Sequence, residues 1–480
     1  MRKLKKVMAL SLALAMGASL VACGGDTAST DTEATEAAET EATEATEETE
    51  ANEDAAKAEA DLSADGKVLN IQCWNDEFAR RLTAHYPGYE ANDPDDATAG
   101  GKIGDIEVKF TVTPSDDNAY QNKLDQVLPG NADAADDDKV DLFLVEADYA
   151  LKYVNTDLTM PVSDLGIEDS ELSAQYKYTK DIVTDANGNL KGVSWQGCPG
   201  VLIYNREAAK EILGADDPDT VQAAVSDWDT YNETAKKVVE AGYKMTATAN
   251  DTFRTFSDNV STPWVVDGKI VVDDNIKKWV DMSKEQVDAK ICGTGDLWGD
   301  EWSAGFYPDG KVFCYFGPAW LIDFCMAADD SASIASQGGW GATTGPQGFS
   351  WGGTWICAAE GTDNPALVAD IIRKLTVDTD IMLEIVKQDN DFVNNKPAME
   401  QMAADSSYGD AVLGGQNALA MFAAGADKID KSNISEYDQG CTESFQAAMK
   451  DYFEGNTATY EEALDAFYKS VTEKYPELTY

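Results

Sequence analysis

The sequence has a single histidine, His85, and few basic residues: 37 Lys plus Arg stand against 87 Asp plus Glu, giving a formal net charge of -50. A surface so acidic repels polyanions at long range, which excludes nucleic acid as a partner. One histidine and no C-x-x-C pair also leave too few ligands for a zinc or copper site. We therefore expect no metal and no cofactor, and a ligand that is neutral or cationic.

Long hydrophobic runs are absent after residue 21. The chain begins with a basic stub and an apolar run over residues 7–21, which is too short for a stable membrane span and is typical of an export signal. The run ends in Leu-Val-Ala followed by Cys23, which resembles the lipobox of bacterial lipoproteins. We predict a signal peptide over residues 1–22 and a lipid anchor on Cys23. The alternative is an ordinary secretory signal in which Cys23 stands by chance.

Large apolar residues are almost missing from the next segment, residues 23–66, which repeats Glu, Ala and Thr. Such a segment cannot bury a core, so we predict a disordered acidic tether that begins at the lipidated Cys23. A solvated helix of Ala and Glu is the alternative, although frequent Thr and repelling Glu side chains disfavour it.

A disulfide framework is also missing. Eight cysteines are present, and lipidation of Cys23 would leave seven, an odd number with no regular spacing. Most lie in apolar, strand-like runs, where a free thiol behaves as a small hydrophobic group. We predict mostly buried free thiols; one disulfide, for example between Cys314 and Cys325, remains open.

The remaining body of roughly 410 residues is longer than one hydrophobic core usually serves, which favours two lobes. Strands are predicted at 67–74, 106–113 and 140–145, with helices between them, and this alternation indicates parallel sheets covered on both faces. Further strands are expected at 190–195, 201–204 and 311–316, a long helical stretch at 217–242, and a mainly helical end from 365 to 480.

Catalytic motifs are incomplete. Residues 348–352 fit G-x-S-x-G, but a serine hydrolase needs a later histidine and His85 lies far upstream. A near match to a phosphate-binding loop ends in Lys311-Val312, where Ser or Thr should follow the Lys. Carboxylate pairs suited to glycosidase chemistry occur by chance among 87 acidic residues. The sequence therefore favours binding over catalysis.

Tryptophan, by contrast, is plentiful, with eleven residues, many of them where strand-like sequence passes into a loop. Indole faces stack on the apolar faces of sugar rings, while nearby carboxylates and amides bind hydroxyl groups. Trp74-Asn75-Asp76-Glu77 brings both kinds of group to the carboxyl end of the first strand, where open α/β sheets bind ligands. This pattern favours a sugar ligand.

The order of several segments then resembles a known family. These are Trp74–Glu77, Val140–Tyr149, Val193–Gln196 with Leu202–Arg206, Phe316–Trp320 and Trp351–Trp355. Together they resemble the extracellular solute-binding proteins of bacterial ABC importers, in the carbohydrate-binding, maltose-binding-protein-like branch (family 1).

This resemblance implies an α/β fold of the two-lobed, type II periplasmic-binding-protein kind, with each lobe a sheet flanked by helices and a hinge of crossing strands between them. The chain would cross near Gln196, Gly339 and Phe392. The first lobe would hold residues 67–195 and 341–391, and the second residues 196–340 and 392–480.

The resemblance also implies a receptor, not an enzyme, that captures a neutral sugar or oligosaccharide by lobe closure and delivers it to the transmembrane subunits of a permease. We expect a monomer at the outer face of the cell membrane, held there only by its lipid. The alternatives are a glycan-degrading lipoprotein, an adhesion or scaffold module, and a receptor for a non-sugar solute. The predicted ligand-binding residues are Trp74, Asn75, Asp76, Glu77, Glu146, Asp148, Tyr149, Trp195, Gln196, Trp298, Trp302, Trp320 and Trp351.

Overall fold

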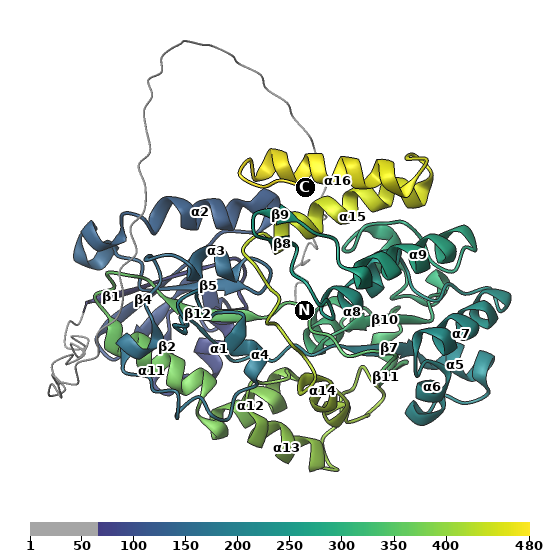
Figure 1. Ribbon diagram of the computed structural model, residues 1–480. Helices are drawn as coiled ribbons and strands as arrows, with labels where there is room; N and C mark the ends of the chain where they lie inside the picture. The colour runs from purple at the N-terminus through teal and green to yellow at the C-terminus, as the bar shows by residue number, and fades with distance from the viewer. Residues whose placement is uncertain (1–65) are drawn as a thin grey trace, which may run out of the picture.

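The computed structural model describes residues 66–480, so the predicted signal peptide, Cys23 and nearly all of the acidic tether lie outside the described residues. A seven-stranded sheet forms the centre of one half of this body (Figure 1). In order across the sheet its strands are β2 (Tyr89–Ala91), β3 (Gly101–Ile103), β4 (Ile106–Val112), β1 (Val68–Cys73), β5 (Leu142–Glu146), β12 (Thr354–Ala358) and β6 (Val193–Ser194).

The middle of this larger sheet is parallel, as the alternation of strands and helices predicts. β1 pairs in parallel with β4 and with β5, and its side chains are almost all buried because helices cover both faces. β12 runs antiparallel to β5, since the chain enters it on returning from the other half of the molecule. The helices of this half are α1 (Glu77–His85), α2 (Ala119–Val127), α3 (Ala150–Val154), α4 (Lys177–Asp181), α11 (Pro365–Thr376) and α12 (Thr379–Asp389).

The second half is built on a smaller, wholly antiparallel sheet in the order β10 (Cys314–Gly317), β7 (Val201–Asn205) and β11 (Trp340–Thr343). The strands expected at 201–204 and 311–316 correspond to β7 and β10 of this sheet. The helical stretch predicted at 217–242 is two helices, because the carboxylate of Asp227 accepts a hydrogen bond from Thr230 N and begins a new one. The helices of this half are α5 (Arg206–Leu213), α6 (Pro218–Ala224), α7 (Trp228–Glu240), α8 (Phe253–Ser257), α9 (Asp274–Asp288) and α10 (Asp300–Ala304).

The end of the chain is mainly helical, as predicted. Figure 1 shows α15 and α16 as an antiparallel pair along one side of the molecule, and α15 packs against α9. A short hairpin of β8 (Val265–Val266) and β9 (Lys269–Ile270) lies near the C-terminus. The remaining helices are α13 (Lys396–Ala404), α14 (Leu419–Ala426), α15 (Asp438–Glu454) and α16 (Tyr460–Lys474).

Three stretches, residues 196–200, 349–353 and 391–394, connect the two halves and are called the crossing segments below. They are joined by backbone hydrogen bonds: Gly197 N donates to Phe392 O at 2.9 Å, and Gly200 N donates to Phe349 O at 2.8 Å. The second crossing expected near Gly339 comes later, because β11 pairs in the smaller sheet. The return to the larger sheet therefore does not begin at residue 341. The other lobe boundaries stay a prediction.

All seven cysteines among the described residues are free, and six of them are buried. This confirms the predicted free thiols, and the disulfide left open between Cys314 and Cys325 is not formed.

A glycine in the crossing segments provides a test of their packing. A Cβ added at Gly200 would lie 2.0 Å from Cζ of Phe349, whereas a Cβ at Gly130 would meet nothing within 4 Å. We predict that Gly200→Ala lowers the free energy of unfolding by about 1–3 kcal/mol, because the ring of Phe349 must move, and that Gly130→Ala leaves it almost unchanged. Urea unfolding of both variants measures the difference; equal stabilities would contradict this packing.

Candidate functional site

A cleft with a volume of about 680 Å³ lies between the two halves, where the carboxyl ends of parallel strands β1 and β5 meet. Nine of the predicted ligand-binding residues line it, and they come from both halves and from the crossing segments. Open α/β sheets bind their ligands at the carboxyl ends of parallel strands. The nine are Trp74, Asn75, Asp76, Glu77, Glu146, Gln196, Trp298, Trp320 and Trp351.

Three indole rings form one wall of the cleft. Trp298 and Trp320 stack with centroids 6.0 Å apart, and the ring of Trp351 lies 5.1 Å from that of Trp320, edge to face. Trp320 Nε1 donates to Trp351 O at 3.1 Å, which holds this wall in place. Trp298 is 41% exposed and has a φ of 71°, an uncommon left-handed conformation for a bulky residue that is often found at functional sites.

A network of polar side chains supports the floor of the cleft. Gln196 Nε2 donates to Glu77 Oε1 at 2.6 Å and to Asp391 Oδ2 at 3.0 Å, and Arg81 pairs with Asp391 and with Asp389. Burial raises the pKa of Glu77 to about 7, although the charge of Arg81 opposes the shift. The network therefore fixes the position of the Glu77 carboxyl group at the floor of the cleft.

Glu146 is the carboxyl on the other side of the floor. Its Oε2 accepts a hydrogen bond from Asp148 N at 2.8 Å. Burial, with help from the charge of Asp148, raises the pKa of Glu146 to about 8, and Arg254 opposes this only in part. Burial likewise raises the pKa of Asp323 to about 8, with the charges of Asp410 and Asp391 contributing. The cleft thus holds carboxyl groups that change charge near neutral pH.

Four predicted residues lie outside the cleft. Trp195 and Trp302 are buried, at 0% and 2% exposed, so they are core residues; Trp302 Nε1 donates to Asp251 Oδ1 at 2.8 Å. Tyr149 is buried as well. Asp148 points away from the cleft and forms an ion pair with Arg254. The structure does not bring these four side chains to the cleft, and their contact with a ligand stays a prediction.

Several lining residues escaped the sequence analysis. Phe324 stands in the stretch 321–326, which is apolar except for Asp323 and is typical of a core segment, yet its side chain is 46% exposed at the cleft. Arg80 lies one turn after Asp76 on the first helix, so helical spacing could have found it. The Arg80 guanidinium sits 5.2 Å from the centroid of the Phe324 ring, across the cleft. Asp323 and Asp329 complete this rim.

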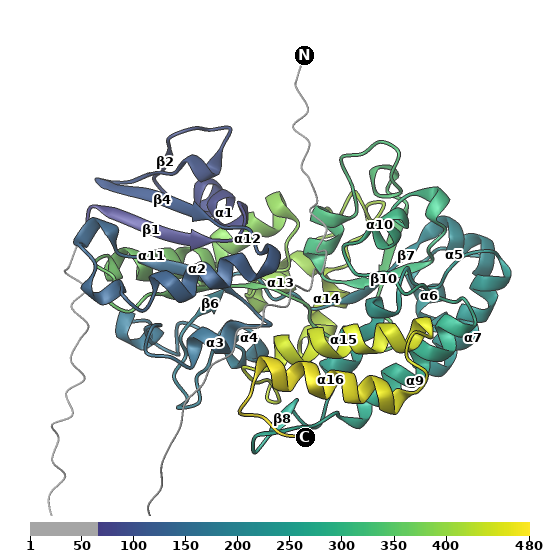
Figure 2. The ribbon, with the colours of Figure 1, turned by 90° about the horizontal axis from the view of Figure 1, so that it is seen from above.

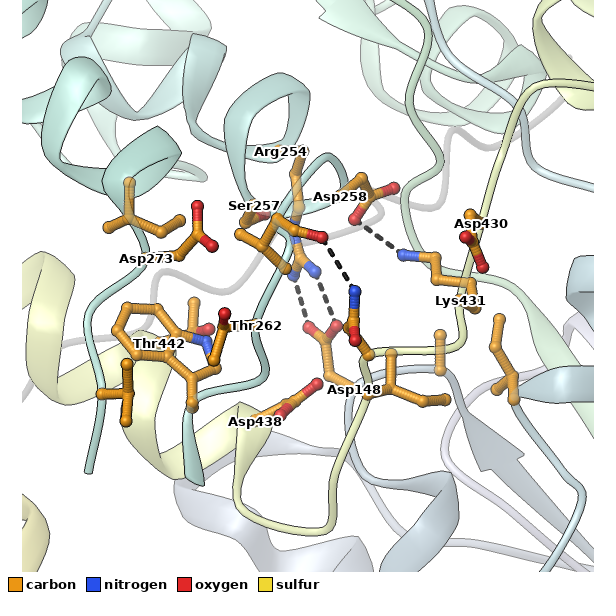
Figure 3. A pocket seen from close by; sticks show the side chains of 18 residues that line it. Asp148, Arg254, Ser257, Asp258, Thr262, Asp273, Asp430, Lys431, Asp438 and Thr442 are labelled. Atoms are coloured by element: carbon orange, nitrogen blue, oxygen red, sulfur yellow. Dashed lines mark hydrogen bonds and ion pairs between the residues drawn. The ribbon is translucent and has the colours of Figure 1, made fainter. Parts of the chain in front are cut away.

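A second, smaller cavity lies under residues 430–438 (Figure 3). Its lining includes Asp148 and Arg254, whose side chains face each other, and Asp258 paired with Lys431. Figure 2 shows α1 and α10, which lie beside the cleft, toward one side of the molecule. It shows α15 and β8, which lie beside the small cavity, toward the other side. The segment 146–148 lies between the two cavities.

Among residues 66–480, the serine-hydrolase motif lacks a paired histidine, and metal-ligating side chains do not cluster. Ser350, from the G-x-S-x-G match, donates its hydroxyl to Asp258 Oδ2, and His85 Nε2 is bonded to Asp389, so the two do not form a catalytic pair. Within this range no group of three or more His, Cys, Asp or Glu side chains is placed to hold a metal ion. The described helices also include none with the length and apolar character needed to cross a bilayer.

Comparison with known proteins gives a family and a fold. The family model described as bacterial extracellular solute-binding protein matches residues 96–413. No curated protein matches the chain. A crystal structure of an extracellular solute-binding protein of family 1 is similar to it with a TM-score of 0.67 at 17% identity, covering 84% of this chain and 99% of that one.

Two ligand complexes are also similar in structure. An ABC transporter associated binding protein from Bifidobacterium animalis subsp. lactis, in complex with beta-1,6-galactobiose, has a TM-score of 0.60 at 17% identity, covering 86% of this chain and 99% of that one. The galacto-N-biose-/lacto-N-biose I-binding protein from Bifidobacterium longum, with lacto-N-biose, has a TM-score of 0.61 at 13% identity, covering 87% and 100%. These likenesses confirm the two-lobed type II fold.

The pKa of Glu146 generates a prediction about stability. Its ordinary value is 4.5, and burial raises it to about 8 in the folded protein. Between these values the folded state keeps a proton that the unfolded chain has released, so the contribution of Glu146 to the free energy of unfolding falls as pH rises. Glu146→Gln should therefore make the decline in stability from about pH 4.5 to about pH 8 shallower. Urea unfolding at several pH values measures it.

The control for this experiment is Glu207→Gln, which changes an exposed carboxyl on α5 by the same chemistry. This variant should keep the wild-type pH dependence. If Glu146→Gln also keeps it, the carboxyl of Glu146 is not held in a buried site.

Proposed function

The chain belongs to the family of bacterial extracellular solute-binding proteins, and from this premise we propose that it is the receptor of an ABC importer that captures a neutral sugar or oligosaccharide. The cleft carries this proposal, because it combines an indole wall with carboxyl and amide groups between two lobes. Stacking on indole faces and hydrogen bonding to hydroxyl groups are the interactions that sugars require. Structural neighbours in complex with beta-1,6-galactobiose and lacto-N-biose support it.

Capture would proceed by closure of the lobes on the sugar. The sugar ring would stack on the indole rings of Trp298, Trp320 and Trp351. Its hydroxyl groups would form hydrogen bonds with Glu77, Gln196 and Glu146 at the floor of the cleft. A ligand that touches both lobes stabilises the closed form only by the contacts that it gains there. The permease would then recognise the closed arrangement and receive the sugar unaltered. Members of this family bind solutes and do not transform them, and we propose the same for this chain.

The family has an extracellular or periplasmic location, and the finer proposal is a lipid anchor on Cys23 at the outer face of the cell membrane. Leu20-Val21-Ala22-Cys23 after a short apolar run supports it. A tether of about 40 residues would keep the receptor within tens of ångströms of the membrane and so raise its effective concentration at the permease.

The identity of the ligand class has a direct test. A panel of neutral oligosaccharides should include at least one that raises the melting temperature, since a ligand that binds only the native state stabilises it. The sugar should be recovered uncut, which separates a receptor from a glycosidase. If no sugar raises the melting temperature, the receptor takes another kind of solute.

A second prediction concerns the indole wall. Trp320→Ala should weaken the binding of the sugar identified in that panel by about 1–3 kcal/mol in titration calorimetry, because a stacking face is lost. Tyr480→Ala is the matched control, as Tyr480 is a 70% exposed aromatic residue at the C-terminus, outside the cleft. Unchanged affinity in Trp320→Ala would remove this residue from the site.

The anchor is tested separately. Cys23→Ser should release the protein into the medium or the soluble fraction and abolish labelling by a radioactive fatty acid, because serine carries no thiol for the lipid. Retention of Cys23→Ser in the membrane fraction would contradict the anchor.

A further inference from the structure

One ion pair connects the two lobes outside the crossing segments. Arg254 on α8, in the half with the smaller sheet, meets Asp148, which follows β5 of the larger sheet (Figure 3). Nη1 donates to Oδ1 at 2.6 Å and Nη2 donates to Oδ2, so the contact is bidentate. The two side chains are 20% and 30% exposed. A shielded, bidentate pair is the kind that contributes most to fixing a geometry.

The helix that carries Arg254 is also fixed to a crossing segment. Asp258, one turn further along, accepts hydrogen bonds from Ser350 N at 2.6 Å and from Ser350 Oγ at 2.8 Å. Lys431 donates to the other oxygen of Asp258 at 2.7 Å, and both side chains are well buried. The segment of α8 and Asp258 therefore contacts a crossing segment through Asp258 and the opposite lobe through Arg254.

Asp148, the acidic member of the ion pair, also contacts a residue of the cleft. The backbone N–H of Asp148 donates to Glu146 Oε2 at 2.8 Å, and Glu146 lines the cleft. Asp148 therefore binds Arg254 through its side-chain carboxylate and the carboxyl of Glu146 through its backbone N–H. If Asp148 shifts, the carboxyl of Glu146 loses its donor.

The lobe arrangement that contains this ion pair also brings the cleft walls together. Arg80 of the first lobe lies over the ring of Phe324 of the second at the rim, while Arg254 and Asp148 are in contact on the far side. The two contacts are thus compatible with one orientation of the lobes.

We propose that Arg254 is a positioning residue: through Asp148 it holds the lobes in the orientation in which the cleft walls meet and keeps Glu146 aimed at the ligand. The role of Glu146 toward a ligand rests on the proposed function; the effect on the lobes and on Asp148 does not. Arg254 itself would touch no ligand.

The test uses the full chain without any ligand, so that it stands apart from the choice of sugar. Spin labels on unnatural amino acids at exposed Lys102 and Lys236, one in each lobe, report the interlobe distance by pulsed electron resonance. In Arg254→Gln we expect the distance distribution to shift from its wild-type position and to broaden. Arg254→Lys, which keeps the charge and loses the bidentate contact, should restore it in part.

The matched control is Arg373→Gln, because Arg373 also pairs with a carboxylate, Glu171, but within one lobe. It should lose stability without any change in the interlobe distance. A distribution in Arg254→Gln that superimposes on the wild type would overturn the proposal.

Hydrogen exchange measures the link to Glu146. The amide of Asp148 should exchange faster in Arg254→Gln, while the amides of 143–145 inside β5 keep their protection. Exchange at Asp148 that stays at the wild-type rate would show that the ion pair does not position Glu146. Failure to bind any sugar would leave both results unaffected and would bear only on the proposed function.

Discussion

The site depends on the backbone hydrogen bonds that join the crossing segments 196–200, 349–353 and 391–394. They fix where the two sheets stand relative to each other, and they allow little space: Gly197 and Gly200 lie against the rings of Phe392 and Phe349 so closely that a Cβ would overlap them. In the proposed closure, the lobes would rotate about this bonded strip, because its packing leaves no room for sliding.

Electrostatics adds a second constraint. The chain carries a formal charge of -50, yet the floor of the cleft holds the partly buried carboxyl groups of Glu77 and Glu146, and the buried Asp391 lies beneath Glu77. Arg81, Gln196 and the Asp148 amide compensate part of this cost by donating hydrogen bonds or supplying charge. Burial also raises the pKa of Glu77 and of Glu146 toward neutrality, so part of the charge is removed by protonation. Glu77 and Glu146, which are costly to bury, both line the cleft in which we propose that a sugar binds.

The length of the chain and the family resemblance predicted the two-lobed fold, and nine of the predicted residues line the cleft. Trp74–Glu77 follow a buried strand, and open α/β sheets bind ligands in the crevice outside the carboxyl ends of their strands. The four predicted residues that lie outside the cleft make contacts that no local pattern reveals. Trp195 and Gln196 are neighbours in an extended segment, so their side chains point to opposite sides; Gln196 faces the cleft, and Trp195 packs on Phe78 in the core. Asp148 shows the same limit over a longer range, since its partner Arg254 lies 106 residues away.

In the proposed function, the two lobes close on a sugar and do not cut it. Small-angle X-ray scattering with and without an oligosaccharide from the neutral panel, followed by recovery of that sugar, tests it most directly. The account predicts a smaller radius of gyration with the sugar present and the sugar returned intact. An unchanged radius with every sugar, or a sugar returned cleaved, would contradict it.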